Sequence, residues 1–427
     1  MKNSAQILIK NARLIEPLSE FHLQQVDLLL NNGKLAQIAT NIISDDTETF
    51  SAENLHVSLG WMDLRANFSD PGMEDREDLE SGAMAAWQGG FTSVGLSPQT
   101  NPVADNKASI QYINGASRSS PINLLPYGAF SRETKGEELS ELYDMNKAGA
   151  LAFSNGKRSV KNSALMKLAL LYNRDLKRPL QVLSFDPDLM SDGQMHEGSK
   201  STWLGLKGIP EIAETISQAR DIRLAEYCES ALHFAGISCT QSIELLQEAQ
   251  EKGLAISGDV NLMNLLFTAN DLESYNSSLK VFPPLREMRD KTNLIQALKD
   301  GVIKGIASNH EPRTIEEKRC EFDLASFGAA TLEGFFGALN AALEKEMNLS
   351  QIIYQISRAP RELTHYQANM QIIAGQEVEL TFFNPAIEWS WNDLKPFSKA
   401  ANYPFALLPL KGKALATYVK GKFSPIA

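Results

Sequence analysis

The sequence is poor in the residues that most often bind metal ions. Its 427 residues include six histidines and three cysteines. The cysteines, Cys228, Cys239 and Cys320, are far apart and form no CxxC pair, so they indicate neither a disulfide framework nor a zinc ribbon. Because histidine and cysteine are the principal zinc ligands, few residues are available from which a zinc site could be built.

Other features that would point to particular partners are also missing. No apolar run approaches the roughly 18 residues of a membrane span, and residues 1–6 lack the apolar core of a signal peptide. The net charge is -11, and no block of lysine or arginine interrupts the chain. We therefore expect a cytoplasmic protein with neither a membrane nor a nucleic acid as its main partner.

The central part of the chain alternates apolar runs of strand length with helical patterns. A single α/β barrel commonly takes about 250 residues, so this chain has room for one barrel and a smaller domain. The eight expected barrel strands cover residues 57–64, 92–96, 122–129, 150–153, 180–183, 232–237, 254–257 and 302–307. Strands and helices in this order predict an α/β fold, a (β/α)8 TIM barrel.

Both ends of the chain are typical of short β-strands. The expected strands cover 7–10, 26–30 and 35–38 near one end, and 378–383 and 415–422 near the other. Residues 31–34 match a hairpin turn. We expect the two ends to fold together into a small β-sandwich domain of residues 1–56 and 370–427, with the barrel formed by residues 57–369.

Polar side chains alternate along the end of the first expected barrel strand. Asp63, Arg65 and Asn67 are two residues apart, so they share one face of the strand, toward the mouth of the barrel. The guanidinium of Arg65 has a permanent charge and no lone pair to give, so it repels a metal ion. The carbonyl oxygen of Asn67 is a poor zinc ligand without a strong partner.

The segment around these residues resembles a metal-binding motif of the type I dihydroorotases, zinc-dependent cyclic amidohydrolases of the amidohydrolase superfamily. Residues 60–72 are similar to Gly-Phe-x-Asp-x-His-x-His-x-Arg-Glu-Pro-Gly, with Arg65 and Asn67 in place of the two metal-binding histidines. The resemblance runs from end to end and implies the same barrel and sandwich. Further matches, in family order and spacing, are residues 78–82, 89–94, 98–102, 195–198, 283–286, 297–301 and 317–323.

The resemblance implies that the remaining metal positions have changed as well. Asn155 stands where the family has an acidic residue after the fourth strand, although which of two family aspartates it replaces stays open. Leu183 and Gly236 stand in place of histidines after the fifth and sixth strands, and Asn309 replaces the aspartate that acts as general base. We therefore expect no metal ion and no other cofactor, in contrast to the zinc of active relatives.

The positions that bind substrate in the family are also altered. The resemblance places Ser69, Gln99 and Phe282 where the family binds the carboxylate of dihydroorotate, in a vestigial pocket shared with His310 and Arg313. Loss of a bidentate carboxylate clamp removes several kcal/mol of oriented binding, so we expect poor affinity for dihydroorotate.

The remaining histidines and Arg65 each allow a structural and a functional interpretation. His233 and His310 lie at the ends of expected strands, where a lone histidine is more often a hydrogen-bonded core residue than a ligand. Arg65 either pairs with Asp63 or Asp70 and fills space, or its charge occupies the vacated metal position. We favour a combination, because a buried guanidinium needs its donors satisfied.

Three functions are compatible with the sequence. The first is a dihydroorotase homologue of pyrimidine biosynthesis without catalytic activity. Some bacteria carry such a homologue, which associates with aspartate carbamoyltransferase. The resemblance therefore implies that this chain is a structural or regulatory partner of that enzyme, forms homo-oligomers, or does both. The second is a divergent hydrolase of cyclic amides, similar to dihydroorotase, hydantoinase or allantoinase, with a metal-independent or single-metal site around Asn309, His310 and Arg313. The third is a sensor that binds a small molecule without chemistry.

Overall fold

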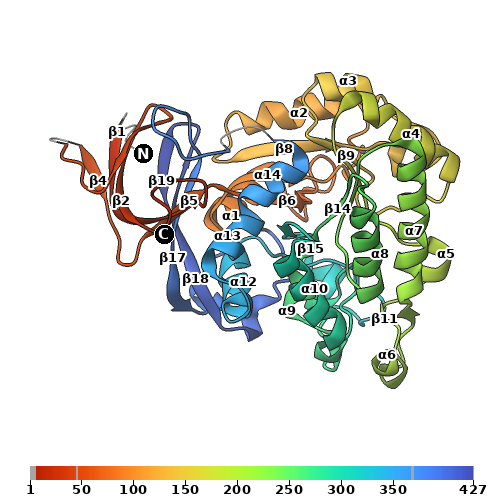
Figure 1. Ribbon diagram of the computed structural model, residues 1–427. Coiled ribbons are helices and arrows are strands. Elements are labelled where there is room, and N and C mark those ends of the chain that lie inside the picture. Colours follow the sequence, from red (N-terminus) through yellow and green to blue (C-terminus); the bar gives the residue numbers. More distant parts are fainter. Residues whose placement is uncertain (1–5, 45–46, 367–369, 427) are drawn as a thin grey trace.

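Two large sheets with separate apolar cores organise the chain in the computed structural model, which describes residues 6–44, 47–366 and 370–426 (Figure 1). The first sheet is mostly antiparallel and is built from both ends of the chain, as predicted. Its strands follow the order β19-β18-β17-β5-β1-β2-β3, with β4 beside β1. They are β1 (Gln6–Ile15), β2 (Gln25–Asn31), β3 (Lys34–Ala39), β4 (Glu48–Phe50), β5 (His56–Leu59), β17 (Leu380–Trp389), β18 (Leu410–Val419) and β19 (Lys422–Pro425).

The predicted turn at 31–34 connects β2 and β3. Asn31 pairs with Lys34, which leaves Asn32 and Gly33 as a two-residue loop. Both have positive φ angles, 49° and 84°. Asparagine followed by glycine tolerates this backbone conformation well, so the sequence of the loop fixes the register of the hairpin.

The second sheet is parallel and forms the wall of the predicted TIM barrel. It has seven strands in the order β14-β13-β10-β9-β8-β7-β6, and a short pair, β15 and β16, continues the wall. A bridge between Ala66 and His310 links that pair back to β6. The strands are β6 (Trp61–Ala66), β7 (Phe91–Leu96), β8 (Asn123–Gly128), β9 (Ala152–Ser154), β10 (Leu180–Val182), β13 (Leu232–Phe234), β14 (Ile256–Gly258), β15 (Val260–Asn261) and β16 (Ile306–Ala307).

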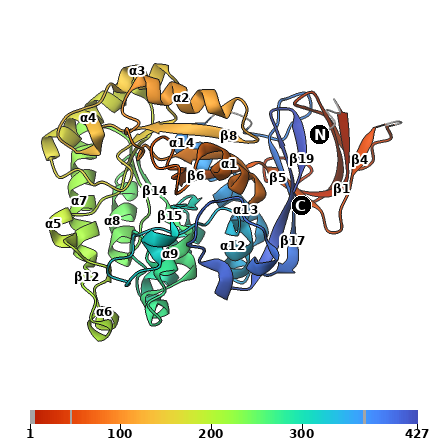
Figure 2. The ribbon, with the colours of Figure 1, turned by 180° about the vertical axis from the view of Figure 1, so that it is seen from behind.

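Helices surround the barrel, while the terminal sheet lies to one side of it (Figures 1 and 2). Every residue of β7 is buried, as expected for a parallel strand covered on both faces. None of the described helices is long and apolar enough to cross a membrane. The helices are α1 (Leu79–Gln88), α2 (Lys107–Ser117), α3 (Leu142–Lys147), α4 (Ser163–Leu176), α5 (Pro187–Met190), α6 (Ser199–Leu204), α7 (Glu211–Cys228), α8 (Thr240–Glu251), α9 (Leu262–Leu266), α10 (Met288–Asp300), α11 (Ile315–Lys318), α12 (Phe335–Leu343), α13 (Leu349–Ile356) and α14 (Arg358–Thr364), and a small pair of strands, β11 (Met195–His196) and β12 (Gly208–Ile209), flanks α6.

The chain passes from the terminal sheet into the barrel at Gly60. We expected one barrel strand over residues 57–64, but β5 pairs with β1 and β17 in the terminal sheet, and only β6 belongs to the barrel. A Cβ atom at Gly60 would lie 2.3 Å from the hydroxyl oxygen of Thr92, so the two strands approach too closely there for a side chain. The other predicted boundary, at 369/370, borders residues 367–369, which lie outside the described part.

The connection between β17 and β18 reaches back onto the barrel. Asn402 is completely buried there. Its side chain accepts a hydrogen bond from the amide of Arg313 at 3.1 Å and donates one to the carbonyl of Glu311 at 3.0 Å. The sandwich thus holds the segment that follows β16, at the mouth of the barrel.

Candidate functional site

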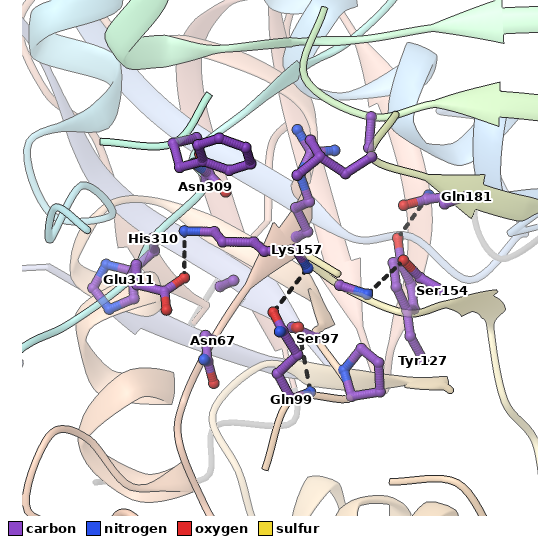
Figure 3. Close-up of a pocket in the computed structure, with 17 residues that line it drawn as sticks. Asn67, Ser97, Gln99, Tyr127, Ser154, Lys157, Gln181, Asn309, His310 and Glu311 are labelled. Atoms are coloured by element: carbon purple, nitrogen blue, oxygen red, sulfur yellow. Dashed lines mark hydrogen bonds and ion pairs between the residues drawn. The ribbon is translucent and has the colours of Figure 1, made fainter. Parts of the chain in front are cut away.

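A narrow pocket lies at the carboxyl ends of the barrel strands, where active sites of TIM barrels are found (Figure 3). About 30 Å³ of it is open to water, which is room for only a few water molecules. Seven predicted site residues line it, whereas Ser69, Asn155, Gly236 and Arg313 are not among its lining residues. The seven are Arg65, Asn67, Gln99, Leu183, Phe282, Asn309 and His310.

Arg65 forms a bidentate ion pair with Asp259, which lies between β14 and β15. The guanidinium nitrogens are 2.5 and 2.7 Å from the two carboxylate oxygens. Arg65 also donates a hydrogen bond to the side-chain oxygen of Asn261. The prediction that Arg65 pairs with Asp63 or Asp70 is wrong. The side chain of Arg65 reaches across the barrel mouth to Asp259 rather than along its own strand.

Asp259 receives further hydrogen bonds from two neighbouring groups. The Nε2 of His233 donates to it at 2.9 Å, and the backbone amide of Gly236 at 2.8 Å. Burial by itself would raise the pKa of Asp259, but the charge of Arg65 and the hydrogen bonds from His233 and Arg65 hold that pKa well below its usual range. Burial likewise opposes the charge of Arg65, but Asp259 raises the pKa of Arg65 above its ordinary value. Both groups therefore stay charged.

The residues at this position do not fit a zinc ion. Both oxygens of Asp259 face guanidinium donors, and the other nitrogen of His233 is bonded to the hydroxyl of Ser257 at 2.8 Å. The side-chain oxygen of Asn67 accepts the amide of Ser69 at 2.9 Å. Within residues 6–44, 47–366 and 370–426, no three His, Cys, Asp or Glu side chains are grouped so that they could hold a metal ion. The guanidinium of Arg65 supplies the positive charge instead.

Asp63 is a buried carboxylate on β6, and its partner is not Arg65. Its oxygens accept hydrogen bonds from the amide and the hydroxyl of Ser308, at 2.7 and 2.6 Å. Burial raises the pKa of Asp63 to about 6. Asp63 therefore joins β6 to the segment after β16.

The remaining predicted metal positions make contacts that serve packing. Asn155 exchanges hydrogen bonds with Ser131, at 3.1 and 2.7 Å. Leu183 belongs to an apolar cluster that includes Phe185 and Phe282. Gly236 has a φ angle of 67°, and a Cβ atom on it would lie 2.8 Å from the side-chain nitrogen of Asn261. These positions offer no lone pair to a metal ion in the pocket.

The predicted base position and its neighbour are both committed to structural contacts. Asn309 donates its amide to the carbonyl of Phe282 at 3.0 Å. The Nδ1 of His310 accepts the amide of Thr331 at 3.0 Å, and its Nε2 lies 3.6 Å from a carboxylate oxygen of Glu77. The side chains of His310 and Glu77 are completely buried. His310 is a buried structural residue, as its position at the end of a strand suggested, and so is His233.

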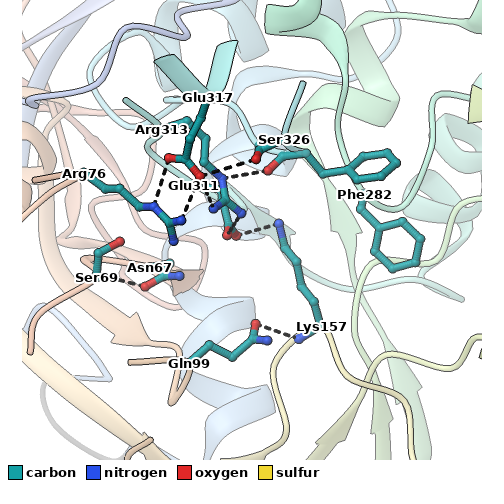
Figure 4. A network of polar contacts seen from close by, with 12 residues as sticks. Asn67, Ser69, Arg76, Gln99, Lys157, Phe282, Glu311, Arg313, Glu317 and Ser326 are labelled. Atoms are coloured by element: carbon teal, nitrogen blue, oxygen red, sulfur yellow. Dashed lines mark hydrogen bonds and ion pairs between the residues drawn. The ribbon is translucent and has the colours of Figure 1, made fainter. Parts of the chain in front are cut away.

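A chain of charged side chains lies at the pocket mouth (Figure 4). The carboxylate of Glu311 lies 2.6 Å from the ammonium of Lys157 and 2.7 Å from the guanidinium of Arg313. The carboxylate of Glu317 lies 3.3 Å from Arg313 and 2.7 Å from Arg76, so it connects the two arginines. Burial opposes the charge of Glu311, but Lys157 and Arg313 lower the pKa of Glu311 to about 2. Burial lowers the pKa of Lys157. The ion pair of Lys157 and Glu311 forms part of the lining of the pocket.

The sequence predictions missed three charged residues of this site. Asp259, Lys157 and Glu311 follow β14, β9 and β16 closely. In a TIM barrel, residues just beyond the carboxyl ends of strands converge at the mouth. A charged residue just beyond the end of a predicted strand is therefore the signal in the sequence that indicates these three residues.

The comparisons with known proteins agree with this architecture. The profile of a family described as dihydro-orotase-like matches residues 56–242. A dihydroorotase from Syntrophotalea carbinolica is 34% identical over 421 residues, covering 98% of this chain and 99% of the relative. One from Ruminiclostridium cellulolyticum is 36% identical over 419 residues, covering 97% of each. Among solved structures, an L-hydantoinase from Arthrobacter aurescens superposes on this chain with a TM-score of 0.86 and covers 98% of this chain and 95% of its own length. The two sequences are 20% identical, so this match shows that the folds are alike.

Proposed function

This chain belongs to the dihydroorotase family of the amidohydrolase superfamily, and from that premise we propose that it is a member without catalytic activity that works through its surface. The observation that carries the proposal is the ion pair between Arg65 and Asp259. The guanidinium of Arg65 lies among the polar groups that face the pocket. Unlike a zinc ion, it has no coordination position at which a water molecule could be activated.

The missing chemistry concerns both the nucleophile and the base. Amidohydrolases with zinc lower the pKa of a bound water so that it attacks at neutral pH. Asn309 carries an amide, which takes up no proton, and Lys157 is paired with Glu311. His310 is buried and holds a backbone amide. The Nε2 of His310 has no hydrogen-bond partner among the described residues, but it lies 3.6 Å from the buried carboxylate of Glu77.

We propose that the retained scaffold is a structural or regulatory partner of aspartate carbamoyltransferase in pyrimidine biosynthesis. The support is the family resemblance, since noncatalytic homologues in some bacteria have this role, together with a whole-length fold that is kept while the site chemistry is lost.

Sedimentation velocity tests the partnership directly. The full chain is mixed at micromolar concentration with the carbamoyltransferase of the same organism. The expected result is a faster boundary that contains both chains. Two species that sediment independently would count against the partnership.

An assay of carbamoyl aspartate cyclisation and of hydantoin hydrolysis on the same preparation separates this role from that of a divergent cyclic-amide hydrolase. The proposal predicts a rate equal to that of the buffer, whereas turnover that survives repurification would support the hydrolase.

A further inference from the structure

Two lysines are buried beside the pocket without a carboxylate partner. Lys280 is 2% exposed and Lys318 is 3% exposed. Within the described part of the chain, their side-chain nitrogens bond to backbone carbonyls and form no ion pair. Lysine is almost never buried without a counter-charge, because removing its charge from water costs free energy that carbonyl oxygens offset only in part. This pair of buried amines is therefore sensitive to its state of protonation.

Lys280 holds the first half of an irregular segment. Residues 319–328, which we call the lysine loop, follow α11 and form neither helix nor strand. The side-chain nitrogen of Lys280 donates to the carbonyls of Phe322 at 2.6 Å and Asp323 at 3.0 Å. It also lies over the rings of Phe322 and Phe327, 5.2 and 5.1 Å from their centroids. Lys280 thus joins two separate parts of the lysine loop.

Lys318 holds the second half of the lysine loop. Its side-chain nitrogen donates to the carbonyls of Ser326 at 2.8 Å and Gly328 at 3.1 Å. The backbone closes on the same residues, since the amide of Gly328 donates to the carbonyl of Lys280 at 2.9 Å and that of Ser326 to the carbonyl of Glu317 at 3.0 Å. An ammonium has three N–H donors and an uncharged amine has two. Each lysine can therefore keep both of its carbonyl contacts after it has lost a proton.

The lysine loop supports one wall of the pocket. The ring of Phe327 packs edge-on against that of Phe282, with 5.9 Å between the centroids. Gly328 lies so close to Glu311 that a Cβ atom on the glycine would be 2.7 Å from the carbonyl oxygen of Glu311. Both Phe282 and Glu311 line the pocket. A movement of the lysine loop therefore changes the shape of the pocket.

The surroundings of both amines favour the uncharged form. Burial lowers the pKa of Lys280 to about 8 and the pKa of Lys318 to about 7. Besides the two amines themselves, the charged and titratable groups that act on them are Asp323, Cys320, Arg313 and Lys157. The two cations in this group add to the effect of burial at Lys318, whereas the carboxylate and the thiol oppose it without cancelling it.

The sign of the pH dependence follows from these two states of the lysine loop. When the loop is released, both amines meet water and regain the ordinary lysine pKa of 10.5. The held loop therefore binds fewer protons than the released loop between pH 7 and pH 10.5. Protons favour the state that binds more of them. A rise in pH across this range stabilises the held loop, and a fall in pH favours its release.

We propose that the lysine loop is a pH-sensitive wall of the pocket, which Lys280 and Lys318 hold in place under alkaline conditions and release as the pH falls toward 7. The outer side of the loop leaves it free to move, because Glu321, Asp323 and Leu324 are exposed to solvent. The pocket has room for only a few water molecules while the loop is held. Release withdraws the support behind Phe282 and Glu311 and so widens the pocket.

Hydrogen exchange of the full chain between pH 7 and pH 9 tests the proposal. The reporting amides, each bonded to a backbone carbonyl in the held state, are those of Ser326, Gly328 and Glu311. After correction for intrinsic exchange, their protection should be lower at pH 7 than at pH 9, by about tenfold for one titrating amine and on the order of a hundredfold for both. Amides of α12, whose residues are mostly buried, should keep their protection. Unchanged protection in the lysine loop, or an equal loss in α12, would overturn the proposal.

A variant without the titrating group separates the amine from the fold. Lys318→Gln keeps a side chain with two N–H donors and takes up no proton. The loss of protection between pH 9 and pH 7 should shrink in this variant to about the tenfold effect of Lys280 alone. The matched control is Lys345→Gln, because Lys345 is exposed, and it should behave as the wild-type chain does. A wild-type pH dependence in Lys318→Gln would contradict the role of Lys318.

Nuclear magnetic resonance of the wild-type chain decides the question if Lys318→Gln fails to fold. With lysine labelled at the ε-carbon, each amine is titrated directly. Two lysines should titrate near pH 7 and pH 8, well below the others. The proposal is overturned if every lysine of the folded chain titrates above pH 9.

Discussion

Arg65 and Asp259 link the first and seventh strands of the barrel through two hydrogen bonds of 2.5 and 2.7 Å. The side chain of Asp259 is completely buried, and that of Arg65 is 14% exposed. A positive charge fixed in the chain thus neutralises a carboxylate at the mouth of the barrel. The same pair carries the proposal that the site is inactive, and we expect it to contribute to the stability of the barrel.

Replacing Arg65 with methionine should strongly destabilise the protein. The change leaves Asp259 buried without its cation, which typically costs about 3 to 5 kcal/mol. Unfolding in urea measures the difference. As a control, Arg132→Met removes an arginine that is 62% exposed, and its effect should stay within about 0.5 kcal/mol. Equal effects of the two changes would show that the buried pair carries no special stability.

Replacing Glu311 with glutamine should flatten the acid dependence of stability. The folded pKa of Glu311 is about 2, below the ordinary value of 4.5, so its contribution is present above about 4.5 and is lost as the pH falls toward 2. The contribution is on the order of 3 kcal/mol. Unfolding free energies measured across this range should fall less in Glu311→Gln than in the wild-type chain.

The control for that prediction is Glu138→Gln, because the Glu138 side chain is 73% exposed. Its acid dependence should match that of the wild-type chain. An unchanged slope in Glu311→Gln would mean that Lys157 and Arg313 do not stabilise the ionised form of Glu311.

Replacing Gly236 with alanine should cost more than the same change at Gly253. Both glycines have positive φ angles, 67° and 77°, so both changes carry a backbone cost of about 1 to 2 kcal/mol. The new Cβ at residue 236 also meets Asn261 at 2.8 Å, whereas at residue 253 no described atom lies within 4 Å. Displacing the partner of Arg65 should add about 1 to 3 kcal/mol, measured by thermal unfolding. Equal losses of stability at residues 236 and 253 would show that the contact with Asn261 adds no cost to the change at Gly236.

The fold was predictable because the pattern of the strands is local. Buried parallel strands such as β7 carry several apolar residues and no charge within a short run, and the loop at Asn32 and Gly33 has the residues that a hairpin needs. The division at Gly60 was not predictable, since it depends on Thr92 packing against it from the next strand. A run of apolar residues through 57–64 carries no sign that its two halves enter different sheets.

The place of the site was predictable, because seven of the predicted residues line the pocket, but their partners were not. The chemistry of Arg65 and Leu183 excluded them as metal ligands from their residue types alone. The partner of Arg65 was not predictable, because Asp259 is 194 residues away and meets it only when the barrel closes. For the same reason the pair of Lys157 and Glu311 appears only in three dimensions.

Metal content measured together with activity distinguishes a family member without catalytic activity from an active one. The chain is produced in medium with added zinc, dialysed without chelator, and analysed for zinc per chain and for cyclisation of carbamoyl aspartate. Because Arg65 occupies the contacts of Asp259, we expect zinc far below one per chain and no dihydroorotate formed above the buffer rate. One zinc per chain together with turnover would contradict it.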